Sequence, residues 1–283
     1  MAETAFQVQY RQEAIASFEQ MQTLVRDTTT IEAEIKGNQA VFLVAGSGSA
    51  QAVTRGVNGL IPARADDLTQ NTATLAEWHD LARKTGFNIF ASQGDQNAIM
   101  QRTTMNVINR KIDQDIITEL NTATNDTGAA QTASLRLALQ AKTILGRNKV
   151  PFDGNIWALI TPDFEGWLLQ VKEFASAEYV SGKPVESGAT AWADKQGYYR
   201  WLGVNWIVHP ELPGAGTVAE KCFMYHKNAI GHAVDVSGMS TQVGYDEEQD
   251  YSFARATVFM GSKLLQNSGV VVLNHDGTGF PAS

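Results

Sequence analysis

The stretch nearest to a catalytic or phosphate-binding motif in this chain is Ala45-Gly46-Ser47-Gly48-Ser49. A serine between small residues is typical of the nucleophile elbow of hydrolases, but the glycine expected at each end of that motif is missing here. A phosphate-binding loop is also glycine-rich, but no Gly-Lys-Ser or Gly-Lys-Thr sequence ends this one. The composition therefore favours a loop tip of small residues, and we expect no catalytic residue.

Three potential metal ligands follow one another at close spacing: Cys222, His226 and His232. The spacing fits no standard zinc pattern, and the sequence offers no clear fourth ligand. The acidic run at residues 246–250 lacks the alternating oxygen ligands and central glycine of a calcium loop. We therefore expect Cys222 to be a small hydrophobe in a strand, the acidic run to be a solvated link, and no metal or cofactor to be bound.

Two further histidines carry weaker signals. His79 stands beside Asp80, and His209 precedes Pro210. General base catalysis needs a positioned partner, which neither short sequence supplies, so surface or capping roles are expected. A soluble hydrolase that uses Ser47 or a histidine stays an alternative, and it would be a small monomer or dimer with a well-formed pocket.

Composition limits the remaining classes of function. The 283 residues carry a net charge of −8, and 43% of them are hydrophobic, which is a globular composition without a broad basic surface for nucleic acid. The single cysteine excludes an intrachain disulfide and favours a reducing compartment. The first residues do not have the pattern of a signal peptide, and no window is apolar enough for a membrane helix. We expect a protein made in a cytoplasm and no membrane partner.

Residues 29–94 predict an extended arm. Residues 29–35 alternate polar and apolar, residues 36–38 have turn chemistry, and residues 39–44 form a second strand candidate. The part of the arm that leads back toward the rest of the chain contains four turn-forming residues: Gly56, Asn58, Gly59 and Pro62. An isolated ribbon of this kind is marginal in water, so the arm needs another surface, and the simplest supplier is a neighbouring copy.

The remaining chain alternates helices and strands, which predicts an α+β fold. A long helix is expected from Asn97 to Asn121, with an apolar stripe along one face made by Met105, Ile108, Ile112, Ile116 and Leu120. A loop at residues 122–131 follows it. Further helices are expected at residues 134–145, after the Thr161 cap, and as a short piece at residues 228–234. Strands are expected at residues 156–160, 198–208, 221–225, 251–265 and 270–273, the last two beside the long helix.

The closing stretch resembles a known family. Phe253-Ala254-Arg255-Ala256, Gly261, Leu264-Leu265 and the valine-rich residues 269–273 are similar to the final strands of tailed-bacteriophage major capsid proteins of the Hong Kong 97 type. The order of parts before them is also similar to that family. The resemblance implies an N-terminal arm at residues 1–28, an extended β-hairpin loop and its base at 29–86, a peripheral domain with the spine helix at 87–127, an inserted axial domain at 128–245, and returning peripheral strands at 246–283.

The resemblance implies a structural, non-enzymatic protein that self-assembles as hexamers and pentamers into an icosahedral shell around double-stranded DNA. Its implied partners are other copies, a portal, and scaffolding or decoration proteins, in a virion assembled in the bacterial cytoplasm. An encapsulin-like shell or another ring-forming virion component is the alternative. The expected contacts between copies involve six residues of the arm: Val41, Leu43, Arg55, Leu60, Ile61 and Arg64. Deleting residues 40–64 is expected to leave a folded core but no closed shell.

Overall fold

The computed structural model describes residues 23–31, 33–46, 50–63, 67–86, 88, 96–175, 199–235 and 238–279. Two compact units share these residues, and each is described by itself. The first unit comprises Met1–Thr23, Glu77–Ile112 and Asp235–Phe259, and the second comprises Leu24–Ala76, Asp113–Val234 and Met260–Ser283. The tip around Ser47 and most of the expected N-terminal arm lie outside the described residues.

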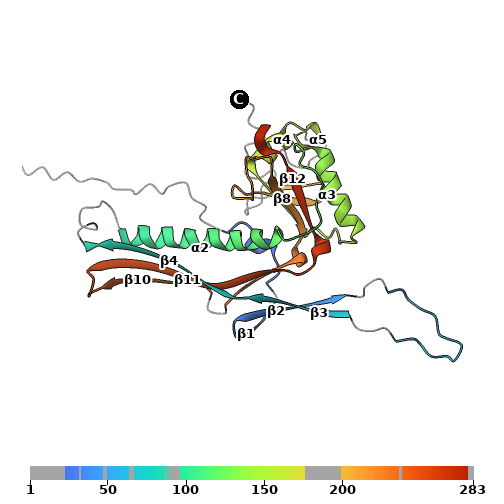
Figure 1. The fold of residues 1–283 in the computed structure, drawn as a ribbon, viewed down its shortest axis with the longest axis horizontal. Helices are drawn as coiled ribbons and strands as arrows, with labels where there is room; N and C mark the ends of the chain where they lie inside the picture. Colours follow the sequence, from blue (N-terminus) through green and yellow to red (C-terminus); the bar gives the residue numbers. More distant parts are fainter. Residues whose placement is uncertain are drawn as a thin grey trace, which may run out of the picture. The chain divides into compact units, whose positions relative to one another are not determined.

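An antiparallel sheet forms much of the first unit. Strand β10 (Ser240–Asp246) pairs with β11 (Tyr251–Leu264), and β4 (Ala76–Thr85) lies on the other side of β11 (Figure 1). The acidic run at residues 246–250 is the tight turn between β10 and β11, which confirms it as a solvated link. Within this unit, the Lys111 ammonium lies 4.0 Å above the Trp78 ring.

Helix α2 (Gln96–Leu120) confirms the predicted long helix almost to the residue. It contributes residues 96–112 to the first unit and residues 113–120 to the second. The predicted stripe is buried at Ile108, Ile112, Ile116 and Leu120. Apolar burial along one face is what stabilises a helix of this length, because propensity alone contributes little. No helix among the described residues is both long and apolar enough to span a membrane.

A five-stranded sheet forms the centre of the second unit. Its order is β12-β8-β5-β7-β6, in which β5 and β7 are parallel and the other pairs are antiparallel. The strands are β5 (Ile156–Ile160), β6 (Tyr199–Trp201), β7 (Val204–Val208), β8 (Glu220–His226) and β12 (Val270–His275). The prediction of one strand over residues 198–208 was wrong. Leu202 and Gly203 both have positive φ, 54° and 74°, and these angles make the two-residue turn that separates β6 from β7.

Three helices accompany this sheet: α3 (Leu135–Arg147), α4 (Pro162–Leu169) and the short α5 (Lys172–Ala175). The Ser134 side chain caps α3 by accepting from Leu137 N, and the Thr161 side chain caps α4 by accepting from Phe164 N at 3.1 Å. Pro162 stands at the start of α4, where its missing N–H has no cost. Both predicted helix starts are therefore confirmed.

Two predictions near the C-terminus need correction. Residues 228–234 are not a helix: a 3-10 turn at Lys227–Ala229 leads into strand β9 (Ile230–Val234), which pairs with β11. Strand β11 does approach α2 in the second unit, where Leu264 N donates to Glu119 Oε2. Strand β12 instead pairs with β8 and packs against α3. In this position the backbone of β12 is hydrogen-bonded to β8. A place beside α2 would leave those backbone groups unpaired.

The arm begins as a three-stranded antiparallel sheet in the second unit, with the order β1-β2-β3. Its strands are β1 (Glu34–Lys36), β2 (Gln39–Gly46) and β3 (Asp67–Thr74). Gly37 has φ 62°, which suits the predicted turn between β1 and β2. The first strand is shorter than predicted, because residues 29–31 form a bend and a single bridge to Gly231 instead.

Candidate assembly surface

The root of the arm is buried on one face only. Strand β2 alternates: Ala40 and Phe42 are buried in a cluster with Ala73 and Ala233, whereas Leu43 remains 63% exposed. Successive side chains of a strand point to opposite faces, so this alternation gives the arm one face toward its own subunit and one face free. The expected contact residues Val41 and Leu43 both lie on the face opposite Phe42, where Leu43 is exposed and Val41 is half-buried.

Close packing fixes the root to β9. A Cβ added to Gly231 would lie 2.6 Å from Cε1 of Phe42, so the ring occupies the space that a side chain on Gly231 would need. The Asn71 amide donates to Leu265 O at 3.3 Å, and Leu75 N donates to Asn38 O at 2.8 Å. The root is therefore part of the folded second unit, which also shows that deleting residues 40–64 would remove buried side chains. A deletion meant to spare the core must be confined to the tip.

The segment that leads into the arm is also firmly held. Leu24 N and Val25 N donate to the two carboxylate oxygens of Asp113, at 2.9 and 3.4 Å. The Thr28 hydroxyl shares a hydrogen bond with the Tyr225 hydroxyl, and Val25 and Thr28 are buried. Residues 24–28, which the resemblance places in the N-terminal arm, thus pack into the second unit.

A small hairpin turn shapes the tip of the arm. Gly59 N donates to Gly56 O at 2.8 Å, and Gly56 N donates to Leu60 O at 3.0 Å. Gly59 has φ 71°, the left-handed conformation expected of glycine at the end of a three-residue hairpin loop. The sequence indicated a turn here, and the hydrogen bonds define which residues make it.

Apolar side chains along this tip lie in solvent. Among the residues expected to contact a neighbouring copy, Leu60 is 73% and Ile61 66% exposed, and Arg55 is exposed as well. Arg64 lies outside the described residues. Two further valines, Val53 and Val57, are also exposed, and the sequence reasoning did not single them out. Single exposed apolar residues are ordinary, but a run of them on a loop without its own core indicates a contact surface.

The candidate metal ligands each have a different partner. Cys222 Sγ lies 3.9 Å from Glu220 Oε1, and burial raises the pKa of the thiol. His226 pairs with Asp153 at 3.1 Å, and hydrogen bonds from Asn155 and then from His226 lower the pKa of Asp153 to about 2. Within the described residues, no group of three or more His, Cys, Asp or Glu side chains is placed to hold a metal.

His232 belongs to a buried chain of polar groups that the sequence did not indicate. Its Nδ1 lies 2.9 Å from Ser262 Oγ, which in turn donates to Asp115 Oδ2 at 2.6 Å. Serine stands in the middle of this chain, whereas a hydrolytic triad needs the imidazole between serine and carboxylate. Burial lowers the pKa of His232 to about 4, so the imidazole is neutral at pH 7.

His79 and His209, the other histidines considered in the sequence, do not form a catalytic pair with each other. His79 is a surface residue of the first unit whose ring nitrogens contact Thr257 Oγ1 and Glu77 Oε1, each at 2.8 Å. His209 is buried in the second unit, where its Nδ1 accepts from Glu211 N at 3.1 Å. This confirms the expected surface role for His79, whereas the buried His209 accepts a turn hydrogen bond and has its Nε2 3.4 Å from Asp113 Oδ2.

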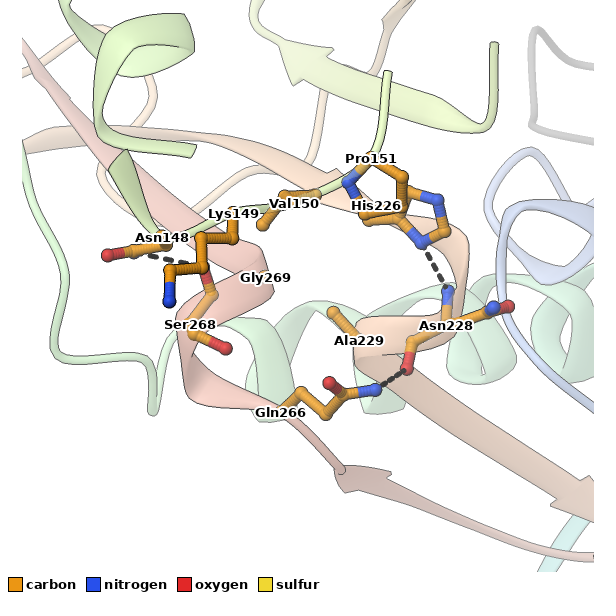
Figure 2. A pocket seen from close by; sticks show the side chains of 10 residues that line it. All are labelled: Asn148, Lys149, Val150, Pro151, His226, Asn228, Ala229, Gln266, Ser268 and Gly269. Atoms are coloured by element: carbon orange, nitrogen blue, oxygen red, sulfur yellow. Dashed lines mark hydrogen bonds between the residues drawn. The ribbon is translucent and has the colours of Figure 1, made fainter. Parts of the chain in front are cut away.

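A hollow of about 260 Å³ lies in the second unit where three turns meet (Figure 2). Figure 2 shows that its polar groups bond to one another: Asn228 N donates to His226 Nδ1, and the Gln266 amide donates to Asn228 O. The Asn148 amide likewise donates to Ser268 O at 3.0 Å. These bonds hold the ends of α3, β8 and β11 together. The polar groups of the hollow therefore stabilise the fold.

Comparisons with known proteins agree with this geometry. A family model described as phage capsid protein matches residues 2–277. A structure from Mycobacterium phage Che8 is similar with a TM-score of 0.73 and 19% identity, covering 96% of this chain and 98% of that one. The capsid of cyanophage P-SCSP1u gives 0.70 and 12%, covering 96% and 93%, and that of cyanophage Pam1 gives 0.69 and 11%, covering 99% and 98%. No curated protein matches the chain.

The chain belongs to the phage capsid protein family, because the family model spans nearly all of it. It is a structural protein of the virion capsid, as the resemblance implied. The mixed helix-and-sheet fold matches capsid structures over almost their whole length, which confirms the expected fold class.

Proposed function

We propose that copies of this protein assemble through their arms into a closed icosahedral shell of hexamers and pentamers that encloses double-stranded DNA. One observation carries the proposal: the tip of the arm exposes Leu60, Ile61 and Val57 around a two-bond hairpin that has no core of its own. Such a loop gains stability only against another surface. In a family of shell proteins, a second copy is the nearest supplier.

The energetics suit a contact between copies. Burying one aliphatic side chain completely contributes roughly 1.5–3 kcal/mol, so Leu43, Leu60 and Ile61 together can hold a subunit contact. Each copy in a closed ring both gives an arm and receives one. Many such contacts act together, so the shell is far more stable than any single contact.

The distribution of charge also supports a contact between the tip and another copy. Arg55 is the only charged residue between positions 50 and 63, and Arg64 follows directly. The whole chain carries a net charge of −8. A tip whose charged side chains are arginines therefore meets a chain with 30 acidic and 22 basic residues, and this imbalance favours the approach of the tip to another copy. We include Arg55 and Arg64 in the proposed contact on these grounds, and Val41 because it lies on the same face of β2 as Leu43.

The same negative balance suits a container for DNA. A wall without a concentrated basic surface does not grip the packaged polymer. On the basis of the family, we also propose a portal and scaffolding or decoration proteins as partners. We propose assembly in the bacterial cytoplasm on the same basis. The division into an N-terminal arm, extended loop, peripheral domain and axial domain, at the boundaries given above, is part of the same proposal.

Size-exclusion chromatography followed by negative-stain microscopy tests the proposal on the purified full chain. Closed shells of uniform diameter with fivefold and sixfold units are expected. Tubes or isolated rings would favour another virion component, and small monodisperse species would overturn the proposal. Nuclease treatment of shells from infected cells, followed by extraction, tests the cargo: protected double-stranded DNA is expected.

A further inference from the structure

Asn58 and Gly59 form the single Asn-Gly pair in the chain. They lie in the hairpin turn at the tip of the arm, where Gly59 N donates to Gly56 O. Asn58 is exposed, and nothing lies within 4 Å of the position a Cβ on Gly59 would take. Within the part of the chain that the structure describes, no hydrogen bond holds the Asn58 carboxamide.

This pair of residues can react with itself. The backbone nitrogen of the glycine attacks Cγ of the asparagine, a new N–Cγ bond forms, and the side-chain nitrogen leaves as ammonia with the proton from the glycine nitrogen. The product is a five-membered cyclic imide. Water then adds to one of its two carbonyl carbons and opens the ring to aspartate or isoaspartate. Glycine permits the attack because it has no side chain to obstruct it.

We infer that Asn58 is a site of spontaneous deamidation through this cyclic imide in the free subunit. The attack requires the Gly59 N–H to leave Gly56 O, and that bond closes a turn in a segment that forms no strand. Opening such a turn disturbs no packed core, because the residues around it are all exposed. The inference concerns the unassembled chain and does not depend on shell formation.

Comparable residues elsewhere are held in place. The Asn125 amide donates to Asn267 O at 2.7 Å, and the residue after Asn125 carries a side chain. The two Asp-Gly pairs begin with Asp153 and Asp276, whose carboxylates accept hydrogen bonds from Asn155 and Thr278. Deamidation at Asn58 would place a new carboxylate at the apolar tip, three residues from Arg55, and would change the charge of the surface proposed to meet a neighbour.

The experiment follows the unassembled full chain at mildly alkaline pH and 37 °C, with a urea-unfolded sample in parallel. Trypsin cuts after Arg55 and Arg64, so the tip is released as one peptide of residues 56–64. We expect that peptide to gain the mass difference between NH₂ and OH and to separate into two products, with isoaspartate in excess. The rate should rise with hydroxide concentration. The peptide with Asn125 is the internal control and should stay unchanged in the folded sample.

Two results would overturn the inference. One is an unmodified tip peptide in the folded chain at a time when the unfolded sample is fully converted. The other is a product that contains aspartate alone, since direct hydrolysis of the side chain gives no isoaspartate. Asn58→Gln, which would need a larger ring, should slow the conversion strongly while leaving the fold and the exposure of the tip unchanged.

Discussion

The ring of Phe42 in β2 fills the space beside Gly231 in β9, so that a Cβ on Gly231 would lie 2.6 Å from Cε1 of that ring. Phe42 is 2% exposed. The contact ties the first long strand of the arm to a strand that follows it by most of the length of the chain. It separates the arm into a root that belongs to the subunit's core and a tip that does not.

Gly231→Ala should destabilise the subunit, because the new methyl group must displace the Phe42 ring in a packed cluster. Overpacking of this kind typically costs about 1–3 kcal/mol. Urea unfolding followed by circular dichroism would measure it as a lower midpoint. Gly56→Ala is the matched control, since its Cβ would meet only Leu60 O at 3.7 Å and should change stability little.

The double variant Gly231→Ala with Phe42→Leu tests the cause. A smaller side chain at position 42 leaves room for the methyl group, so the double variant should lose less stability than the sum of the two single changes. Simple additivity would show that the two side chains do not compete for space.

Val57→Asp and Leu60→Asp should leave folding unchanged and prevent assembly. Both side chains are exposed in the subunit, so surface effects stay within about 0.5 kcal/mol. A charge buried at a contact between copies carries a large desolvation penalty. Light scattering would follow assembly. Val218→Asp changes another exposed valine, which lies outside the arm, and should assemble normally; if it fails to the same degree, the tip has no special role.

Ile116→Asp should unfold the subunit, because Ile116 is fully buried in the apolar stripe of α2. An unpaired charge in such a site costs several kcal/mol, a large part of a domain's stability of roughly 5–15 kcal/mol. Thr118→Asp is the control on the exposed side of the same helix. Soluble yield and thermal melting of the two variants should differ sharply, and equal melting temperatures would argue against the buried stripe.

Stability should fall as the pH drops from about 6.5 to 4, in part because of His232. Its pKa is about 4 in the folded chain and 6.5 in the unfolded chain, so between these values the unfolded state binds more protons and is favoured. The full penalty is roughly 3 kcal/mol at most. His232→Gln should flatten the dependence of unfolding free energy on pH in this window. A slope identical to that of the parent protein would assign the pH dependence to other groups.

Local patterns predicted those elements whose causes are local. The stripe of α2, the strand at residues 156–160 and the Thr161 cap all follow from spacing and capping within one turn or strand. Strand β3 escaped prediction because its sequence, Asp-Leu-Thr-Gln-Asn-Thr-Ala-Thr, lacks a clear apolar alternation. Strand β9 also escaped prediction. It contains Gly231, whose lack of a side chain leaves room for the ring of Phe42, a residue far away in the chain.

For the candidate surface, too, local sequence predicted the features with local causes and missed those that depend on distant residues. The sequence identified the arm and the apolar residues Leu60 and Ile61, since glycine, proline and missing periodicity mark a loop without a core. It did not show that Val25 is held by Asp113, because these residues are 88 positions apart. Nor did it show that the arm has a buried root, which limits any useful deletion to the tip.

We propose above that the tip of the arm joins copies into a shell. Electron micrographs of the parent protein and of a variant in which residues 50–63 are replaced by a short Gly-Ser linker test it most directly. We expect closed shells for the parent and only folded, unassembled subunits for the variant, with circular dichroism spectra and melting temperatures that match. Closed shells of normal diameter from the variant would contradict it.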